Sequence, residues 1–97
     1  MRYEIHAGNV KVSSAFTGYV EDRMQRLLSD FAFIVSSDLY LHELGTKSPA
    51  HQVRFRVQVP GETLVVEERG NNFQEAFDAA LSAMRRQLTR YKETIRS

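Results

Sequence analysis

Residues 51–59 read HQVRFRVQV, and apolar and polar side chains alternate along the whole stretch. Its apolar members are Val53, Phe55, Val57 and Val59. Strict alternation is typical of a β-strand that buries one face. Pro60 and Gly61 follow directly and predict a tight turn, because Pro fixes φ and Gly tolerates a positive φ. A second strand over residues 63–69 completes a β-hairpin, whose apolar face must be covered by other parts of the chain.

Two more strands are predicted upstream of this hairpin. Residues 2–7 alternate between apolar and polar side chains, and residues 35–44 do so around Leu39 and Leu41. Only short connections separate the last three strands. Short connections favour antiparallel pairing, because parallel neighbours need a long crossover.

Two amphipathic helices supply the cover that the sheet needs. The first begins after a capping hydroxyl at Ser13 or Ser14 and ends near Asp30, and the second runs from a cap at Asn72 to about Thr94. Apolar residues recur along both at spacings of three and four, which predicts one buried stripe on each helix. The stripes are Phe16, Val20, Met24, Leu27, Leu28 and Phe31, then Phe73, Ala76, Phe77, Ala80, Leu81, Met84, Leu88 and Tyr91.

The predicted order is therefore βαβββα within a single domain, residues 1–97. The fold class is α+β: a two-layer sandwich in which a four-stranded sheet carries both helices on one face. With 42% hydrophobic residues, a chain of 97 residues can build one core but has little room for a deep substrate cleft.

The residue patterns of most enzyme classes are absent. The chain has no cysteine and no glycine-rich phosphate loop. Glu67 and Glu68 are adjacent on a predicted strand and point to opposite faces, which is poor geometry for paired acid–base catalysis. The longest apolar run, residues 31–35, is far shorter than the roughly 20 residues that span a membrane. We expect no catalytic residue, no cofactor, no small-molecule substrate and no membrane partner.

Three histidines are the only candidates for an imidazole metal site: His6, His42 and His51. If the first two strands pair, His6 and His42 become neighbours on the outer face of the sheet. Zinc takes three or four protein ligands, and the sequence offers no clear third one. We therefore expect surface histidines and no metal.

The net charge is only +1, but the charges are unevenly distributed. Residues 83–97 hold five basic residues and one acidic residue, whereas residues 60–78 hold one basic residue and five acidic ones. Such asymmetry marks one pole of the molecule as a candidate anion-binding surface. The candidate RNA-binding bases are Arg23 and Arg26 in the first helix and Arg85, Arg86, Arg90 and Lys92 in the last.

Two alternatives stay open for the basic residues. Bases in the last turns of a helix also suit its dipole, so a merely solvated surface explains part of the cluster. The outer sheet face carries Arg54, Arg56, Tyr40 and His42, on which single-stranded bases can stack. For that face we favour a solvated surface.

Several short sequences occur in a characteristic order along the whole chain. They are Gly8-Asn9-Val10 after the first strand, Tyr19-Val20 followed by Arg23 and Arg26, the strand and turn over 57–62, Ala76-Phe77-Asp78, and RQLTRYK over 86–92. In this order and spacing the chain resembles the family of ribosome hibernation promoting factors and ribosome-associated inhibitors.

This resemblance implies a fold like a double-stranded-RNA-binding domain and a non-enzymatic role. Members bind 16S rRNA in the mRNA and tRNA channel of the small (30S) ribosomal subunit and keep idle ribosomes inactive under stress or in stationary phase. By position, the basic sites of the family's helices match Arg23, Arg26, Arg86, Arg90 and Lys92. A bacterial cytoplasmic protein, monomeric off the ribosome, is implied, either a short form or the N-terminal domain of a long form. The alternatives are a general RNA-binding module and a protein-interaction domain of the sigma-factor modulation type.

Overall fold

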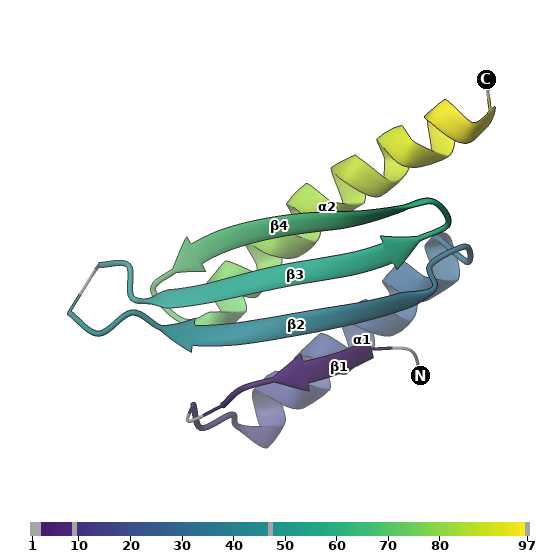
Figure 1. The fold of residues 1–97 in the computed structure, drawn as a ribbon. Coiled ribbons are helices and arrows are strands. Elements are labelled where there is room, and N and C mark those ends of the chain that lie inside the picture. Colours follow the sequence, from purple (N-terminus) through teal and green to yellow (C-terminus); the bar gives the residue numbers. More distant parts are fainter. Residues whose placement is uncertain (1–2, 9, 47, 97) are drawn as a thin grey trace.

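The computed structural model describes residues 3–8, 10–46 and 48–96. Its elements are β1 (Tyr3–His6), α1 (Ser14–Asp30), β2 (Ser36–Glu43), β3 (His51–Val59), β4 (Glu62–Gly70) and α2 (Phe73–Arg96). The predicted order βαβββα is confirmed (Figure 1). The first strand is shorter than predicted: Ala7 lies beyond its end, and Arg2 lies outside the described residues.

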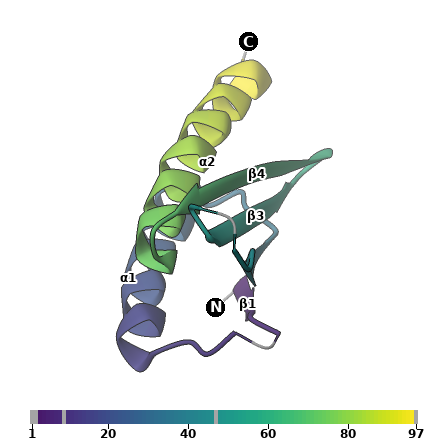
Figure 2. The ribbon, with the colours of Figure 1, turned by 90° about the vertical axis from the view of Figure 1, so that its left-hand side faces the viewer.

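The four strands form one sheet in the order β1-β2-β3-β4. The predicted antiparallel pairing holds for β2 with β3 and for β3 with β4. By contrast, β1 pairs with β2 in parallel, because α1 lies between them in the chain and carries it back to the same end of the sheet. Both helices cover one face of the sheet, as predicted (Figure 2). Neither of them, within the described residues, has an apolar stretch that could cross a membrane.

The core lies between the inner face of the sheet and the two helices. Val53, Phe55 and Val57 of β3 have no exposed surface, and neither have Met24 of α1 and Phe77 of α2. These residues come from the alternating pattern of β3 and from the helical stripes. Most of the predicted stripe residues are buried, and Phe16, Leu28 and Phe73 are partly buried at the margin of the core.

Two contacts fix how α2 sits on the hairpin. At its start, the Asn72 side chain accepts a hydrogen bond of 2.8 Å from the backbone N–H of Glu75, which caps the helix as predicted. Near its end, the Tyr91 hydroxyl donates a hydrogen bond to the carbonyl of Pro60, in the turn between β3 and β4. Beyond Tyr91 the helix continues past the sheet (Figure 1).

Gly70, the last residue of β4, allows α2 to approach the sheet closely. A Cβ atom there would lie 2.6 Å from the backbone nitrogen of Ala76 and 3.0 Å from Cβ of Glu75. Both neighbours belong to the first turns of α2, so the helix would have to shift to accept any side chain. The glycine is required by packing.

We predict that Gly70→Ala lowers the free energy of unfolding by about 1–3 kcal/mol, because the added methyl overpacks a backbone contact. Gly18→Ala is the matched control, since a Cβ at this position in α1 meets no atom within 4 Å. This control should stabilise by about 0.5–1 kcal/mol, which is the usual gain when alanine replaces glycine inside a helix. Urea denaturation of both variants checks the opposite signs, and equal effects would contradict the packing role of Gly70.

Candidate nucleic-acid interface

The two helices lie side by side and run in the same direction (Figure 2). Tyr19 of α1 contacts Asp78 of α2 near the start of both, and Asp30 contacts Arg85 about three turns further along α1 and two turns further along α2. All the sequence-predicted bases belong to these two helices, which form the layer on one side of the sheet. Rigid helices are favourable carriers of such bases, since the backbone loses no further entropy on binding.

Three bases of α2 have no carboxylate of the described residues within ion-pairing distance: Arg86, Arg90 and Lys92. Arg86 and Arg90 are exposed and lie one helical turn apart. Arg86 donates a hydrogen bond of 3.1 Å to the Ser82 hydroxyl, and Lys92 is half-buried. Both arginines border a groove of about 430 Å³ between α2 and β4, whose other lining residues include Gln87, Thr94 and one carboxylate, that of Glu62. This part of α2 can receive an anion.

The other three predicted bases lie within ion-pairing distance of carboxylates of the protein, although the Arg26 side chain is 73% exposed. Asp22 lies 2.8 Å from Arg23 and 3.9 Å from Arg26, and Asp30 lies 2.9 Å from Arg85. The Arg23 guanidinium also sits 3.9 Å above the Tyr19 ring, a cation–π contact. The six bases are therefore not equivalent.

Neither aspartate was predicted from the sequence as a partner of these bases. Asp22 gives a local signal, because it precedes Arg26 by four residues and therefore shares its helix face. Asp30 gives none, because Arg85 is 55 residues away in the chain and only the packing of the two helices brings them together.

The outer face of the sheet carries mixed charges. In the parallel register His6 pairs with Tyr40, and the centroids of their stacked rings lie 4.6 Å apart. His42 lies two residues further along β2 and lines the same shallow hollow as His6. The His6 Nε2 atom lies 2.8 Å from Asp38, and Arg56 lies 3.5 Å from the same carboxylate.

Three possible metal ligands meet at this point of the sheet. The ligand atoms of Glu4, His6 and Asp38 lie within 4.8 Å of one another, a group that the sequence analysis did not find. Arg56 already supplies a positive charge to Asp38, and the Glu4 side chain is 77% exposed. The arrangement is an ion-pair network on the surface of the sheet.

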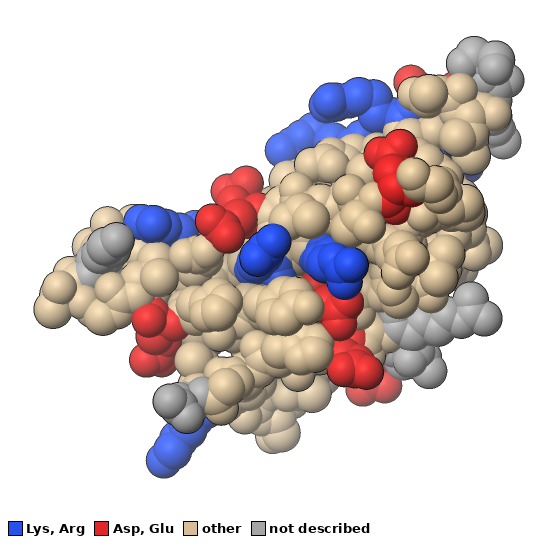
Figure 3. All heavy atoms as spheres, in the orientation of Figure 1, with Lys and Arg blue, Asp and Glu red and all other residues tan. Residues whose placement is uncertain are grey.

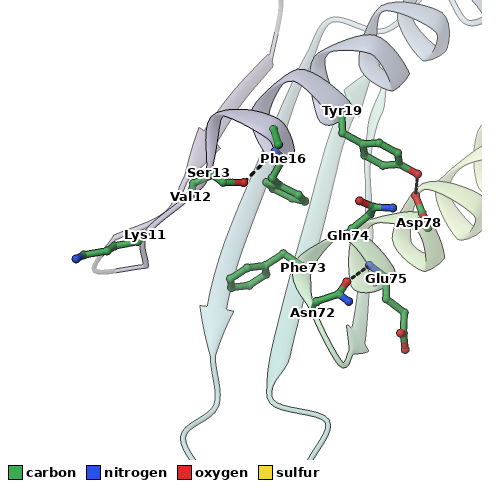
Figure 4. A pocket seen from close by; sticks show the side chains of 11 residues that line it. Lys11, Val12, Ser13, Phe16, Tyr19, Asn72, Phe73, Gln74, Glu75 and Asp78 are labelled. Atoms are coloured by element: carbon green, nitrogen blue, oxygen red, sulfur yellow. Dashed lines mark hydrogen bonds between the residues drawn. The ribbon is translucent and has the colours of Figure 1, made fainter.

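A hollow of about 690 Å³ separates the first turns of the two helices (Figure 4). Phe16 and Phe73 line it, and the Tyr19 hydroxyl donates a hydrogen bond of 2.5 Å across it to Asp78. The hydrogen bond to Asp78 is the largest cause that raises the pKa of Tyr19 above its ordinary value, and partial burial adds to it. Glu75 and Asp78 make this end acidic, so we place no RNA contact here.

The distribution of charge over the surface agrees with this division. Figure 3 views the outer face of the sheet, where blue and red side chains are intermixed. Blue side chains gather at the margin where the C-terminal half of α2 extends past the strands. Red side chains also lie at this end, so the described surface there is rich in bases but not uniformly basic.

A family model described as Sigma 54 modulation protein / S30EA ribosomal protein matches residues 3–96. The chain belongs to this family. The resemblance stated from the sequence is confirmed, since the match includes every strand and both helices.

Relatives within the Sigma 54 modulation protein / S30EA ribosomal protein family agree with this assignment. The ribosome hibernation promotion factor of Staphylococcus aureus (strain COL) is 23% identical over 95 residues, which cover 98% of this chain and 50% of that protein. The chain thus spans half the length of this curated relative.

Two solved structures share the fold. A ribosomal subunit interface protein from Coxiella burnetii superposes with a TM-score of 0.83 at 19% identity, covering 96% of this chain and 99% of that one. The N-terminal domain of Protein Y from Thermus thermophilus superposes with a TM-score of 0.75 at 22% identity, covering 94% and 99%. The predicted α+β sandwich is the fold of these proteins.

We predict that Tyr19→Phe lowers the free energy of unfolding by about 0.5–1 kcal/mol at pH 7, because the ring stays while a solvent-weakened hydrogen bond to Asp78 is lost. The pKa of Tyr19 is raised in the folded state, so its contribution is complete below about pH 10 and is lost as pH rises through the raised pKa. Denaturation should give different free energies of unfolding for parent and variant below pH 10, and equal ones above the raised pKa of Tyr19.

Burial also raises the pKa of Tyr3. Tyr3 is present in both the parent and the variant, so it does not affect the difference between them. A difference that persists above the raised pKa of Tyr19 would assign the effect to packing of the ring instead of the hydrogen bond.

Proposed function

We propose that this chain is a non-enzymatic factor that binds the small ribosomal subunit and represses translation by keeping idle ribosomes inactive. It acts in the bacterial cytoplasm under stress or in stationary phase, and it contacts 16S rRNA in the channel for mRNA and tRNA. One observation carries the proposal: Arg86 and Arg90 are exposed on a rigid helix, with no described carboxylate paired to them, in a chain of this family. The names of the similar proteins, a hibernation promotion factor and a subunit interface protein, support it.

The chemistry of the site supports RNA as the ligand. Arginine presents a planar fork of donors that matches phosphate oxygens, and contacts to phosphate supply most of the affinity in nucleic-acid complexes. Two forks one turn apart on α2 present such donors side by side. Gln87 and Thr94 also line this groove, where their side chains donate hydrogen bonds to the carbonyls of Val65 and Arg90. The molecule is also slender, with extents of 46 × 24 × 18 Å, which suits a channel.

A protein-binding role is the second candidate. The family description includes modulation of sigma 54, and the outer face of the sheet, with Arg54, Arg56 and Asp38 close together, has the mixed charge of a protein-binding surface. Such a role uses the face opposite to the helices. The two candidates therefore separate by which face tolerates charge reversal.

We predict that Arg86→Glu with Arg90→Glu weakens binding to purified small subunits by about a hundredfold or more, because anions then stand where phosphates bind. The fold should be unaffected, since exposed charges usually alter stability by no more than about 0.5 kcal/mol. Co-sedimentation with small subunits, together with a thermal melt followed by circular dichroism, measures both quantities.

Arg54→Glu with Arg56→Glu is the matched control, because it changes the net charge equally on the opposite face. It should bind small subunits nearly as well as the parent. If the control loses binding while the α2 variant keeps it, the outer sheet face is the interface and the helical assignment is wrong.

We also predict how the affinity for small subunits depends on salt. Each phosphate contact contributes about 0.7–0.9 to the slope of log affinity against log salt concentration. The three bases without ion-paired carboxylates, Arg86, Arg90 and Lys92, therefore give a slope of about −2 to −3. A slope near zero would point to a protein interface instead. Sedimentation assays over a range of potassium chloride concentrations provide the measurement.

A further inference from the structure

Two aspartates of α1 stand among the bases of the interface. Asp22 pairs with Arg23 and Arg26, and Asp30 bridges to Arg85 on α2. About half of each aspartate side chain is exposed, 51% for Asp22 and 55% for Asp30, so their charges act on the surface and not in the core. Any RNA that reached the three paired arginines would also meet these carboxylates.

Both aspartates lie on one stripe of α1. A shallow hollow of about 370 Å³ is lined by Asp22, Gln25, Arg26, Ser29 and Asp30. An RNA strand placed against Arg26 would therefore lie beside two negative charges.

The stability of α1 does not explain why an aspartate occupies position 30. It is the last residue of α1, and the last turn of that helix carries no base. A carboxylate at the C-terminus opposes the helix dipole and destabilises the helix slightly. Its exposed ion pair with Arg85 adds little stability, because surface ion pairs contribute between nothing and about 1 kcal/mol.

We infer that Asp22 and Asp30 are specificity determinants of the RNA interface: they hold Arg23, Arg26 and Arg85 in ion pairs and oppose binding to arbitrary RNA. This inference rests on the proposed function, since it concerns the same surface. Binding to arbitrary RNA is almost wholly electrostatic and grows with the number of available bases. A phosphate gains little from an arginine that already has a carboxylate partner, and the displaced carboxylate repels it.

Discrimination follows from this repulsion. Specific interfaces combine attractive contacts to the right partner with repulsive elements against others. Here the attraction comes from Arg86, Arg90 and Lys92, and the repulsion comes from Asp22 and Asp30. An unstructured RNA strand meets both, whereas a rigid RNA surface can present phosphates to α2 and none to the aspartates.

The test compares two isosteric double variants that each raise the net charge from +1 to +3. Asp22→Asn with Asp30→Asn removes the carboxylates at the interface. Glu4→Gln with Glu67→Gln removes two exposed carboxylates from the strands and serves as the control. Binding of each to poly(U) RNA and to purified small subunits is measured by fluorescence anisotropy and sedimentation. Thermal melts establish that both variants are folded.

The aspartate variant should bind poly(U) at least about fivefold more tightly than the parent, the effect expected from removing one charge near a phosphate in water. Its salt slope on poly(U) should steepen by about 2, since three arginines become available to a single strand. Its preference for small subunits over poly(U) should fall, and the control should change poly(U) affinity less than twofold.

Equal tightening by both variants would show that only net charge matters and would overturn the inference. So would unchanged binding of poly(U) by the aspartate variant. If loss of the Asp30–Arg85 bridge unfolds that variant, Asp22→Asn alone, which leaves the bridge intact, gives the same comparison. If the parent fails to bind small subunits, the proposed function falls, and the poly(U) comparison still decides the role of the aspartates.

Discussion

Burial of the inner face of β3 beneath α2 determines the rest of the structure. Val53, Phe55 and Val57 have no exposed surface, and Phe77 and Met84 of α2 are equally buried against this layer. A helix that must place its apolar stripe on the sheet has no freedom to rotate about its axis. Arg86 and Arg90 lie outside that stripe, so their exposure follows from core packing and not from any interaction of their own.

The parallel arrangement of the helices adds a second constraint. Both positive dipole ends lie at one end of the layer, near Glu75 and Asp78, and both negative ends lie toward Arg85 and Arg90. Glu75 in the first turn of α2 suits the positive end of that helix, whereas Asp30 at the C-terminus of α1 opposes the dipole of its own helix. The basic character of the other end therefore comes from the side chains of α2. This is how a protein of net charge +1 presents a local basic surface.

The fold was readable from the sequence because its signals are local. Alternation in residues 51–59 and the helical stripes identify every element to within about two residues, and short loops give the antiparallel pairs. The parallel pairing of β1 and its register depend on tertiary packing, so the His6–Tyr40 stack was missed. The six candidate bases were proposed from charge distribution and helical spacing, and the family resemblance implied five of them. Their partners were not predicted, because Asp30 and Arg85 meet only through helix contact.

The hydrogen bond from Tyr91 to Pro60 is the last described contact that joins α2 to the turn of the hairpin. Arg90 and Lys92 flank Tyr91 in the chain, and the helix after it extends beyond the strands. The C-terminal part of α2 is therefore positioned in part by a turn that lies 31 residues earlier in the chain. Sequence changes in that turn can therefore alter how the helix that carries the arginines is positioned, without changing any charge on the helix.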